Sequence, residues 1–242
     1  MRAMIFAAGL GTRLKPLTDT LPKALVPVGG KPLLQILIDR LVTAGCTEAV
    51  VNVHHFSEKI IDYLYYTKQT LKTHISDESA QLLETGGGIR KAARFFGDGE
   101  PFLVHNVDIL HNVDLQSFYE ENARRGDAVL LVSHRKTQRY LLFNDQDNLV
   151  GWTNLATGEV KSPFPNLNPK QCHMYAFGGI HIFNPRLFQE MDYWPAKFSI
   201  IDFYLDICAK YQIKACVKKD LQLVDVGKLD TLAKAEEFLN VK

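Results

Sequence analysis

The first half of the chain alternates between short, mainly apolar runs and stretches with helical spacing. An apolar run occupies residues 3–8, a short β-rich run 49–53, and a near-continuous apolar run 102–107, which is typical of a strand buried on both faces. Helical spacing is clearest over residues 33–42, directly after Pro32, where the apolar side chains share one face. Strands that alternate with helices in this way predict a parallel, doubly wound sheet.

Further segments extend the alternation. Ser57 and Asp114 are candidate helix caps, and the three glycines at 86–88 are expected to precede a helix that reaches Phe96. The remaining expected elements are strands at 73–76 and 128–133, a helix over 115–124, a strand at 175–183, a short helix from Asn184, a helix capped by Ser199, strands at 213–217 and 221–226, and a final helix from Thr231.

The pattern changes after Arg135. Residues 140–143 and 149–153 flank the polar run 145–148, which predicts a β-hairpin, and a proline-containing loop follows it. We expect this part of the chain to lie over the edge of the sheet.

The chain shows no repeat, low-complexity stretch or linker, so we expect one domain, 1–242. The hairpin insertion, 135–172, separates a first part, about 1–134, from a closing part, 173–242. The expected fold class is three-layer α/β/α, Rossmann-like, with a mixed, mostly parallel sheet and a small β-hairpin insertion.

Composition excludes several classes of function. The 28 Lys and Arg residues against 27 Asp and Glu residues leave a net charge of +1, too balanced for a protein that coats nucleic acid or a membrane surface. No apolar run approaches the roughly 18 residues of a membrane-spanning helix. We therefore expect neither nucleic acid nor membrane as a partner. The cysteines form no C-x-x-C pair, which predicts no zinc site or disulfide framework and favours a reducing, cytoplasmic setting: Cys46, Cys172, Cys208 and Cys216.

The strongest local signal is the glycine-bearing loop Ala7-Ala8-Gly9-Leu10-Gly11-Thr12-Arg13-Leu14 that follows the first strand. Glycine lets the backbone approach a phosphate closely, and the arginine fork matches phosphate oxygens. The loop lacks the third glycine of the dinucleotide fingerprint and the Gly-Lys-Ser/Thr of the P-loop. On these residues alone, a nucleotide-binding loop and an ordinary strand-to-turn connection both remain open. Lys23, on the segment that leaves the loop, is a candidate for a second phosphate contact.

A longer motif resembles a known family. The loop continues as Lys-Pro-Leu-Thr at 15–18, and is followed by Pro-Lys-Ala-Leu-Val-Pro-Val at 22–28 and Lys-Pro-Leu at 31–33. This ordered series resembles the sugar nucleotidyltransferases, or NDP-sugar pyrophosphorylases. The length fits a minimal member without the C-terminal β-helix domain of longer relatives. The resemblance implies the nucleotide-diphospho-sugar transferase fold, with a nucleotide-binding first part and a sugar-binding closing part.

The resemblance also implies roles for individual residues. The arginine that holds the leaving pyrophosphate falls on Arg13, and the lysine that bridges phosphates at the reacting centre falls on Lys23. The residues expected to bind the nucleoside triphosphate are Ala8, Gly9, Leu10, Gly11 and Thr12 in the signature loop, and Glu84, Gly86 and Gly87 in a second glycine-rich turn beneath the nucleobase.

Two aspartates resemble the family's metal ligands. Asp108 ends a buried strand and Asp225 lies in a distant Val-Asp-Val-Gly segment, and two carboxylates with water and phosphate oxygens suit Mg²⁺. Asn106 and Gly179 match positions near the sugar. Relatives usually carry a glycine before the aspartate, whereas this chain has Val107, so the sugar pocket or the local backbone is expected to differ.

The implied reaction joins a nucleoside triphosphate, UTP or GTP, to a sugar 1-phosphate by in-line attack on the α-phosphorus, and releases pyrophosphate. Within the family, the chain looks most like the N-acetylmuramate 1-phosphate uridylyltransferases of cell-wall recycling. Mannose 1-phosphate guanylyltransferase and enzymes with glucose or phosphocholine-type acceptors remain alternatives.

A non-catalytic nucleotide-sugar-binding regulatory protein is an alternative of another class. A dinucleotide-dependent oxidoreductase is disfavoured by Arg13. The sequence leaves the oligomeric state open.

Overall fold

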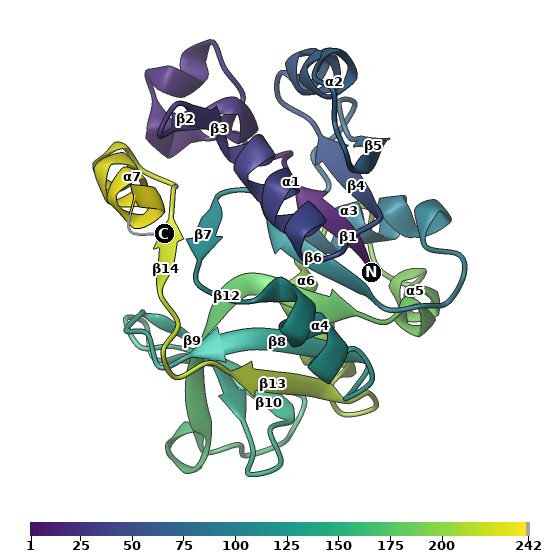
Figure 1. Cartoon of the computed structure of the whole chain (residues 1–242). Coiled ribbons are helices and arrows are strands. Elements are labelled where there is room, and N and C mark those ends of the chain that lie inside the picture. The colour runs from purple at the N-terminus through teal and green to yellow at the C-terminus, as the bar shows by residue number, and fades with distance from the viewer. Residues whose placement is uncertain (241–242) are drawn as a thin grey trace. The chain divides into compact units, whose positions relative to one another are not determined.

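A computed structural model describes residues 1–240 of the chain. The chain divides into two compact units, and Figure 1 labels their helices and strands. The first unit contains Met1–Leu83, Leu103–Phe118 and the described residues from Gln222 onward. The second unit contains Glu84–Phe102 and Tyr119–Leu221. The two units interleave along the chain.

The first unit contains a parallel sheet together with helices and short strands. They are β1 (Arg2–Phe6), β2 (Pro27–Val28), β3 (Lys31–Pro32), α1 (Leu33–Thr43), β4 (Glu48–Val53), α2 (Ser57–Tyr66), β5 (Lys72–Asp77), most of β6 (Phe102–Asn106), β7 (Ile109–His111), the start of α4 (Leu115–Asn122), β14 (Leu223–Asp225) and α7 (Leu232–Asn240).

The parallel strands of the first unit lie in the order β6-β1-β4-β5. The central strand β1 pairs on both sides, with Ala3 opposite Ala49 of β4 and Leu103 of β6, and its residues 3–5 are fully buried. The chain moves outward from β1 through β4 to β5 and then returns to the other side of β1 at β6. Ligands of such sheets bind beyond the carboxyl ends of the strands where this direction changes, here the ends of β1 and β6.

The second unit is built on a mainly antiparallel sheet. Its elements are α3 (Glu84–Ala92), the rest of α4, β8 (Ala128–Ser133), β9 (Arg139–Phe143), β10 (Leu149–Asn154), β11 (Glu159–Lys161), β12 (His173–Phe183), α5 (Phe188–Met191), α6 (Ile200–Ile207) and β13 (Ile213–Val217). Strand β12 pairs antiparallel with β8 and β9, β9 and β10 form the expected hairpin, and β13 pairs parallel with β8.

Strand β12 explains how the hairpin attaches. Its residues 176–183 pair with β8, whereas His173–Tyr175 pair with β9. The hairpin therefore extends the sheet of the second unit, since β12 is long enough to serve two partners. The β12–β8 register shifts between Phe177 and His181, where Gly179 has a φ of +74°. A bulge of this kind favours glycine, which adopts positive φ without strain.

Two helix starts differ from expectation. Ser57 is the first helical residue of α2, and Phe56 occupies the N-cap position with a left-handed φ of +52°, so no side chain caps this helix. Helix α3 begins at Glu84, so the glycines 86–88 lie inside it rather than before it. The physical reason at Gly86 is close packing, because a Cβ there would lie 2.3 Å from the ring of Phe198.

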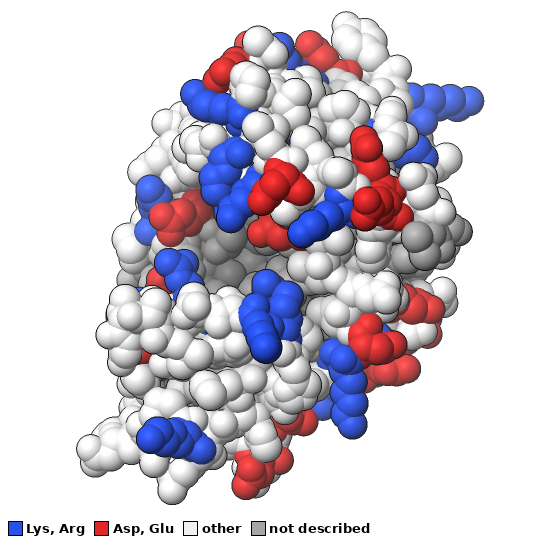
Figure 2. Space-filling model, turned by 90° about the vertical axis from the view of Figure 1, so that its left-hand side faces the viewer, with Lys and Arg blue, Asp and Glu red and all other residues white. Residues whose placement is uncertain are grey.

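The distribution of charged side chains on the surface agrees with the balanced net charge of the sequence. On the face drawn in Figure 2, basic and acidic side chains are interspersed rather than gathered by sign. None of the helices among residues 1–240 combines the length and the hydropathy needed to cross a bilayer.

Candidate active site

The signature loop leaves β1 at the carboxyl edge of the parallel sheet, and a buried asparagine holds its first residues. The backbone N–H groups of Ala7 and Ala8 donate to Asn52 Oδ1, at 2.7 and 3.3 Å. Asn52 lies near the end of β4 and is 1% exposed. The sequence interpretation missed this residue, although a polar side chain at the end of an apolar strand was a usable signal.

A buried carboxylate anchors Asn52 in turn. Asn52 Nδ2 donates to Glu78 Oε1 at 2.8 Å, and Glu78 Oε2 accepts the N–H of Leu83 at 3.1 Å. Glu78 is fully buried directly after β5. The loop after β1 is thereby tied through side chains to the ends of two neighbouring strands, which orients its backbone before any ligand arrives.

The two glycines of the loop have different physical roles. Gly11 has a φ of +65°, and a Cβ there would lie 2.8 Å from Thr18 Cγ2 and 3.1 Å from Lys23 Cβ. Thr18 Oγ1 also donates to Gly11 O at 2.8 Å. Around Gly9, by contrast, a Cβ would meet no atom of residues 1–240 within 4 Å. Gly11 is required by the turn, whereas Gly9 leaves an open approach to the loop backbone.

Lys23 and Asp108 meet in the first unit. Lys23 begins a short 3₁₀ helix, is 8% exposed, and its Nζ forms an ion pair with Asp108 Oδ2. Asp108 follows β6, and the preceding Val107 donates its N–H to Phe6 O at 3.1 Å, which extends the β6–β1 pairing by one step. The side chain of Val107 is buried, so the valine packs into the unit. Two residues 85 positions apart thus share one charged contact.

Asp225 and Arg13 come together at Gly227. Strand β14 pairs antiparallel with β7, with Asp225 opposite Ile109, and the N–H of Val226 donates to Asp108 O at 2.8 Å. Asp225 therefore ends β14, and Asp108 lies in the turn directly before β7, one residue before the partner of Asp225. A Cβ at Gly227 would lie 2.7 Å from both Arg13 Nη2 and Asp225 Oδ1. Only glycine leaves room there for the guanidinium and the carboxylate.

The other expected site residues lie in the second unit, apart from Asn106, which ends β6. Glu84 has a φ of +59° and pairs with Lys197 at 3.5 Å. The N–H groups of Gly86 and Gly87 donate to Phe198 O at 2.9 and 3.3 Å, so both are engaged within this unit.

The comparisons identify the family. The family described as Nucleotidyl transferase matches residues 2–242, nearly the whole chain. This chain belongs to that nucleotidyl transferase family.

Several named enzymes resemble this chain in sequence. The N-acetylmuramate α-1-phosphate uridylyltransferase of Neisseria meningitidis is 35% identical over 79% of this chain and 79% of that protein. The enzyme of the same name from Caulobacter vibrioides is 49% identical over 44% of this chain and 45% of its own length, so that match spans less than half of the relative. A mannose-1-phosphate guanyltransferase of Hypocrea jecorina is 36% identical over 54% of this chain and 37% of that protein.

Solved structures confirm the fold of the family. HddC from Yersinia pseudotuberculosis, complexed with GMP-PN, is 25% identical with a TM-score of 0.76 and covers 98% of this chain and 99% of that one. A UDP-glucose pyrophosphorylase complexed with UDP-glucose has a TM-score of 0.77, with 17% identity, and covers 99% of this chain and 98% of that one. The expected α/β class with a mixed sheet is therefore confirmed.

The donor set of this nucleotidyl transferase fits a hard cation. Asp108 and Asp225 offer carboxylate oxygens, and Mg²⁺ in phosphate-transfer sites is typically held by one or two carboxylates, with phosphate oxygens and waters completing its shell. Residues 1–240 contain no group of three or more His, Cys, Asp and Glu side chains suited to a metal. Asp108 and Asp225 alone are therefore fewer protein ligands than a complete metal cage has.

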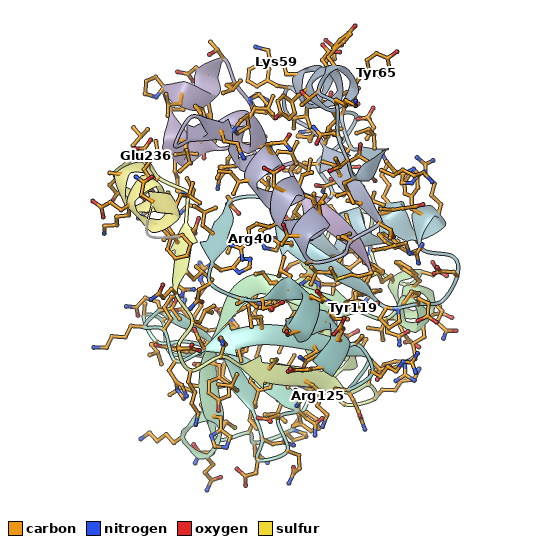
Figure 3. All side chains as sticks on the ribbon, in the orientation of Figure 1. Arg40, Lys59, Tyr65, Tyr119, Arg125 and Glu236 are labelled. Carbon is orange, nitrogen blue, oxygen red and sulfur yellow. The ribbon has the colours of Figure 1, made fainter. Side chains whose placement is uncertain are left out.

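A buried histidine chain supports the segment that carries Asp108. The partners assign its protons: His105 Nδ1–H donates to Asn106 O at 2.7 Å, and His111 Nε2–H donates to His105 Nε2 at 2.9 Å. His111 Nδ1 accepts the N–H of Val113 at 3.0 Å and an Arg40 N–H at 3.1 Å. Arg40 extends from α1 toward β7 (Figure 3).

These hydrogen bonds require that the imidazole ring of His105 is neutral. Burial, with a smaller contribution from the nearby Arg40 charge, lowers the pKa of His105 to about 4. The His105 ring therefore keeps one donor and one acceptor near neutral pH, and the N–H donors at His111 Nδ1 assign the acceptor role to that nitrogen. The sequence interpretation missed these residues, because His105 and His111 are six positions apart and only the β6–β7 turn brings their rings together.

Proposed function

We propose that this protein transfers a nucleotidyl group from a nucleoside triphosphate to a sugar 1-phosphate and releases pyrophosphate. The observation that carries the proposal is the grouping of Lys23 with Asp108, and of Arg13 with Asp225, beside an exposed glycine loop in the first unit. Cations and carboxylates beyond the carboxyl ends of parallel strands are the groups that phosphoryl chemistry needs. Membership of the nucleotidyl transferase family supports the same reaction.

The proposed reaction needs no protein nucleophile. An oxygen of the sugar phosphate attacks the α-phosphorus, a bond forms between them, and the bond to the β-phosphate oxygen breaks as pyrophosphate leaves. The attacking oxygen is already anionic, so alignment and charge neutralisation are the main obstacles. Arg13 would hold the leaving phosphates, and Lys23 would neutralise charge at the reacting centre. Mg²⁺, when held by Asp108 and Asp225, would supply further neutralisation of the phosphates.

We further propose that the substrates are UTP and N-acetylmuramate 1-phosphate, with a UDP-sugar for cell-wall metabolism as product. The support is that the two uridylyltransferase relatives carry this name and that one of them aligns over most of the chain. Similarity to mannose-1-phosphate guanyltransferases favours GTP with mannose 1-phosphate as the second candidate. A cytoplasmic setting is supported by the four cysteines, none of which forms a disulfide.

The test is pyrophosphate release with Mg²⁺ across UTP, GTP, CTP, dTTP and ATP, each against N-acetylmuramate, mannose, glucose and N-acetylglucosamine 1-phosphates and phosphocholine. Turnover with UTP and N-acetylmuramate 1-phosphate is the expected result. Asp108→Asn should abolish this turnover, because it removes the carboxylate charge and changes the shape of the side chain very little. Nucleotide binding without turnover for every acceptor would contradict the proposed reaction and favour a regulatory binding protein.

A further inference from the structure

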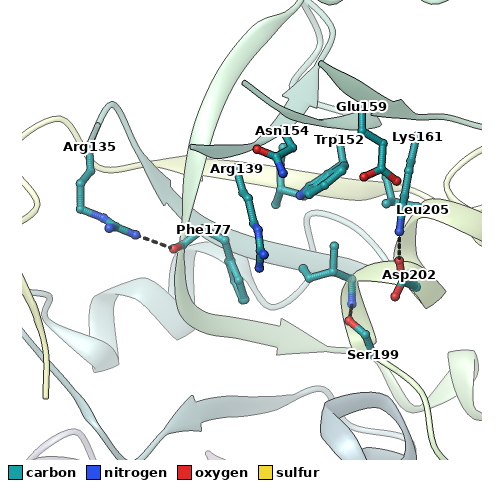
Figure 4. A pocket seen from close by; sticks show the side chains of 12 residues that line it. Arg135, Arg139, Trp152, Asn154, Glu159, Lys161, Phe177, Ser199, Asp202 and Leu205 are labelled. Carbon is teal, nitrogen blue, oxygen red and sulfur yellow. Dashed lines mark hydrogen bonds and ion pairs between the residues drawn. The ribbon is translucent and has the colours of Figure 1, made fainter. Parts of the chain in front are cut away.

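A polar cavity of about 550 Å³ lies within the second unit, on the hairpin side of its sheet. Its walls come from β9, β10, β11, β12 and the start of α6, and Figure 4 shows the lining side chains. Trp152 and Asn154 lie along one wall. A large aromatic face beside planar polar groups suits a sugar ring, because the ring buries its C–H face on the aromatic while its hydroxyl and amide groups form hydrogen bonds.

The cations of this cavity are unequally engaged. Lys161 Nζ pairs with Asp202 at 3.2 Å and lies 5.4 Å from the centre of the Trp152 ring. Among the described residues, the guanidinium of Arg135 donates only a long hydrogen bond of 3.5 Å, to Phe177 O. Within the described chain, the guanidinium of Arg139 has neither a hydrogen-bond acceptor nor a carboxylate partner. Two arginine forks therefore face the cavity without an acidic partner.

The charges are also separated across the cavity. In Figure 4, Arg139 points between Phe177 and Trp152, with Arg135 on one side and the Glu159, Lys161 and Asp202 side chains on the other. A uniformly neutral ligand would leave the arginine side without a counter-charge. A ligand with one carboxylate would place it there, where a planar fork can bind both oxygens.

We propose that Arg139, assisted by Arg135, binds a carboxylate on the acceptor and makes this enzyme selective for an acidic sugar 1-phosphate. The inference rests on the proposed function and assigns its substrate class. N-Acetylmuramate carries a lactyl ether with a carboxylate, and N-acetylglucosamine lacks only that group. Binding of the carboxylate would therefore separate two acceptors that are otherwise alike.

The experiment compares these two 1-phosphates in the wild-type protein and in Arg139→Gln. With UTP and Mg²⁺, Arg139→Gln should raise the KM for N-acetylmuramate 1-phosphate about tenfold to a hundredfold, leave its kcat within about threefold, and leave the N-acetylglucosamine acceptor unchanged. Arg139→Lys should recover part of the loss, because it restores the charge without the fork. Lys136→Gln is the matched control, since it removes a nearby exposed cation that does not line the cavity.

Binding of each acceptor, measured by calorimetry in the presence of a non-hydrolysable UTP analogue, makes the test independent of turnover. Weaker binding of the acidic acceptor alone in Arg139→Gln supports the inference. Equal losses for both acceptors, no loss for either, or a wild-type preference for the neutral acceptor overturns it. Absence of turnover with selective binding intact would contradict the proposed reaction and leave the carboxylate site standing.

Discussion

Single residues in the first unit determine the positions of the charged groups proposed to act in catalysis. Gly227 is the clearest case, because its missing side chain leaves the space that the ends of Arg13 and Asp225 approach. The backbone at Gly227 does not adopt the left-handed conformation. An added methyl group should therefore move the two functional groups and leave the backbone in place.

We predict that Gly227→Ala lowers kcat at least tenfold with a melting temperature within a few degrees of wild type, since small displacements of aligned groups are costly in catalysis. Steady-state kinetics and thermal unfolding check this. Gly97→Ala serves as control, because a Cβ there would meet no atom within 4 Å in the part of the chain that the structure describes. Wild-type turnover in Gly227→Ala would show that Arg13 and Asp225 tolerate the shift.

Burial of His181 sets a pH dependence of stability. Its pKa is lowered by burial from 6.5 to about 3, and neither ring nitrogen has a hydrogen-bond partner among the described residues. The unfolded chain binds the proton first as pH falls, so the contribution of the neutral ring is complete above pH 6.5 and is lost as pH falls toward 3. At pH 5 the loss from this residue is roughly 2 kcal/mol.

We predict that His181→Phe weakens this dependence, because a phenyl ring does not titrate and replaces ring nitrogens that lack partners. Urea unfolding at pH 8 and pH 5 measures it. His105, whose pKa is about 4, remains in both proteins, so part of the dependence should persist. Identical losses in wild type and variant would contradict the assignment to His181.

At the scale of elements, strand ends are held together by side chains as well as by backbone pairing. The end of β4 supplies Asn52, whose amide joins the N–H groups of the signature loop to the buried carboxylate of Glu78. The amide is suited to this position because it accepts on one side and donates on the other. Its loss leaves buried polar groups without partners, which costs more than the hydrogen bonds contribute.

We predict that Asn52→Ala lowers the free energy of unfolding by about 1–3 kcal/mol and raises the KM for the nucleotide more than the KM for the acceptor. Chemical denaturation and steady-state kinetics at a temperature where both proteins are folded check the two effects. A loss of stability with unchanged nucleotide KM would mean that the network holds the strands and does not orient the loop.

At the scale of the whole molecule, Mg²⁺ and the nucleotide should raise the unfolding temperature cooperatively. In the proposed site, the two carboxylates would form an incomplete shell for Mg²⁺, which the phosphates of the nucleotide would complete. A ligand that binds only the folded state raises the unfolding temperature according to its concentration relative to its Kd. The shift with UTP and Mg²⁺ should therefore exceed the two separate shifts added together.

We predict that Mg²⁺ alone at millimolar concentration shifts the melting temperature by less than about 1 °C, and that UTP with Mg²⁺ shifts it by several degrees. Asp225→Asn should remove most of the Mg²⁺-dependent part and keep the shift caused by UTP with EDTA. A large shift with Mg²⁺ alone would point to a complete metal site in the protein.

Much of the element pattern was predictable from local sequence. The helix after Pro32, the strands at 49–53 and 128–133, and the hairpin are present, since periodicity and turn residues are local signals. The start of α3 was misplaced because glycines usually mark a turn, and here Gly86 lies in a helix to accommodate Phe198. Only a partner distant in sequence explains that choice.

The sequence by itself determined the family, the fold class and the candidate residues, because the signature motif is contiguous and hydrophobic periodicity is local. Tertiary structure alone decided which of those residues meet. Lys23 with Asp108, Arg13 with Asp225, and the proton order through His105 and His111 depend on strand order and register. The first two groupings join residues far apart along the chain, and the His105–His111 hydrogen bond forms only where the β6–β7 turn brings the two rings together, so no local sequence pattern encodes these proximities.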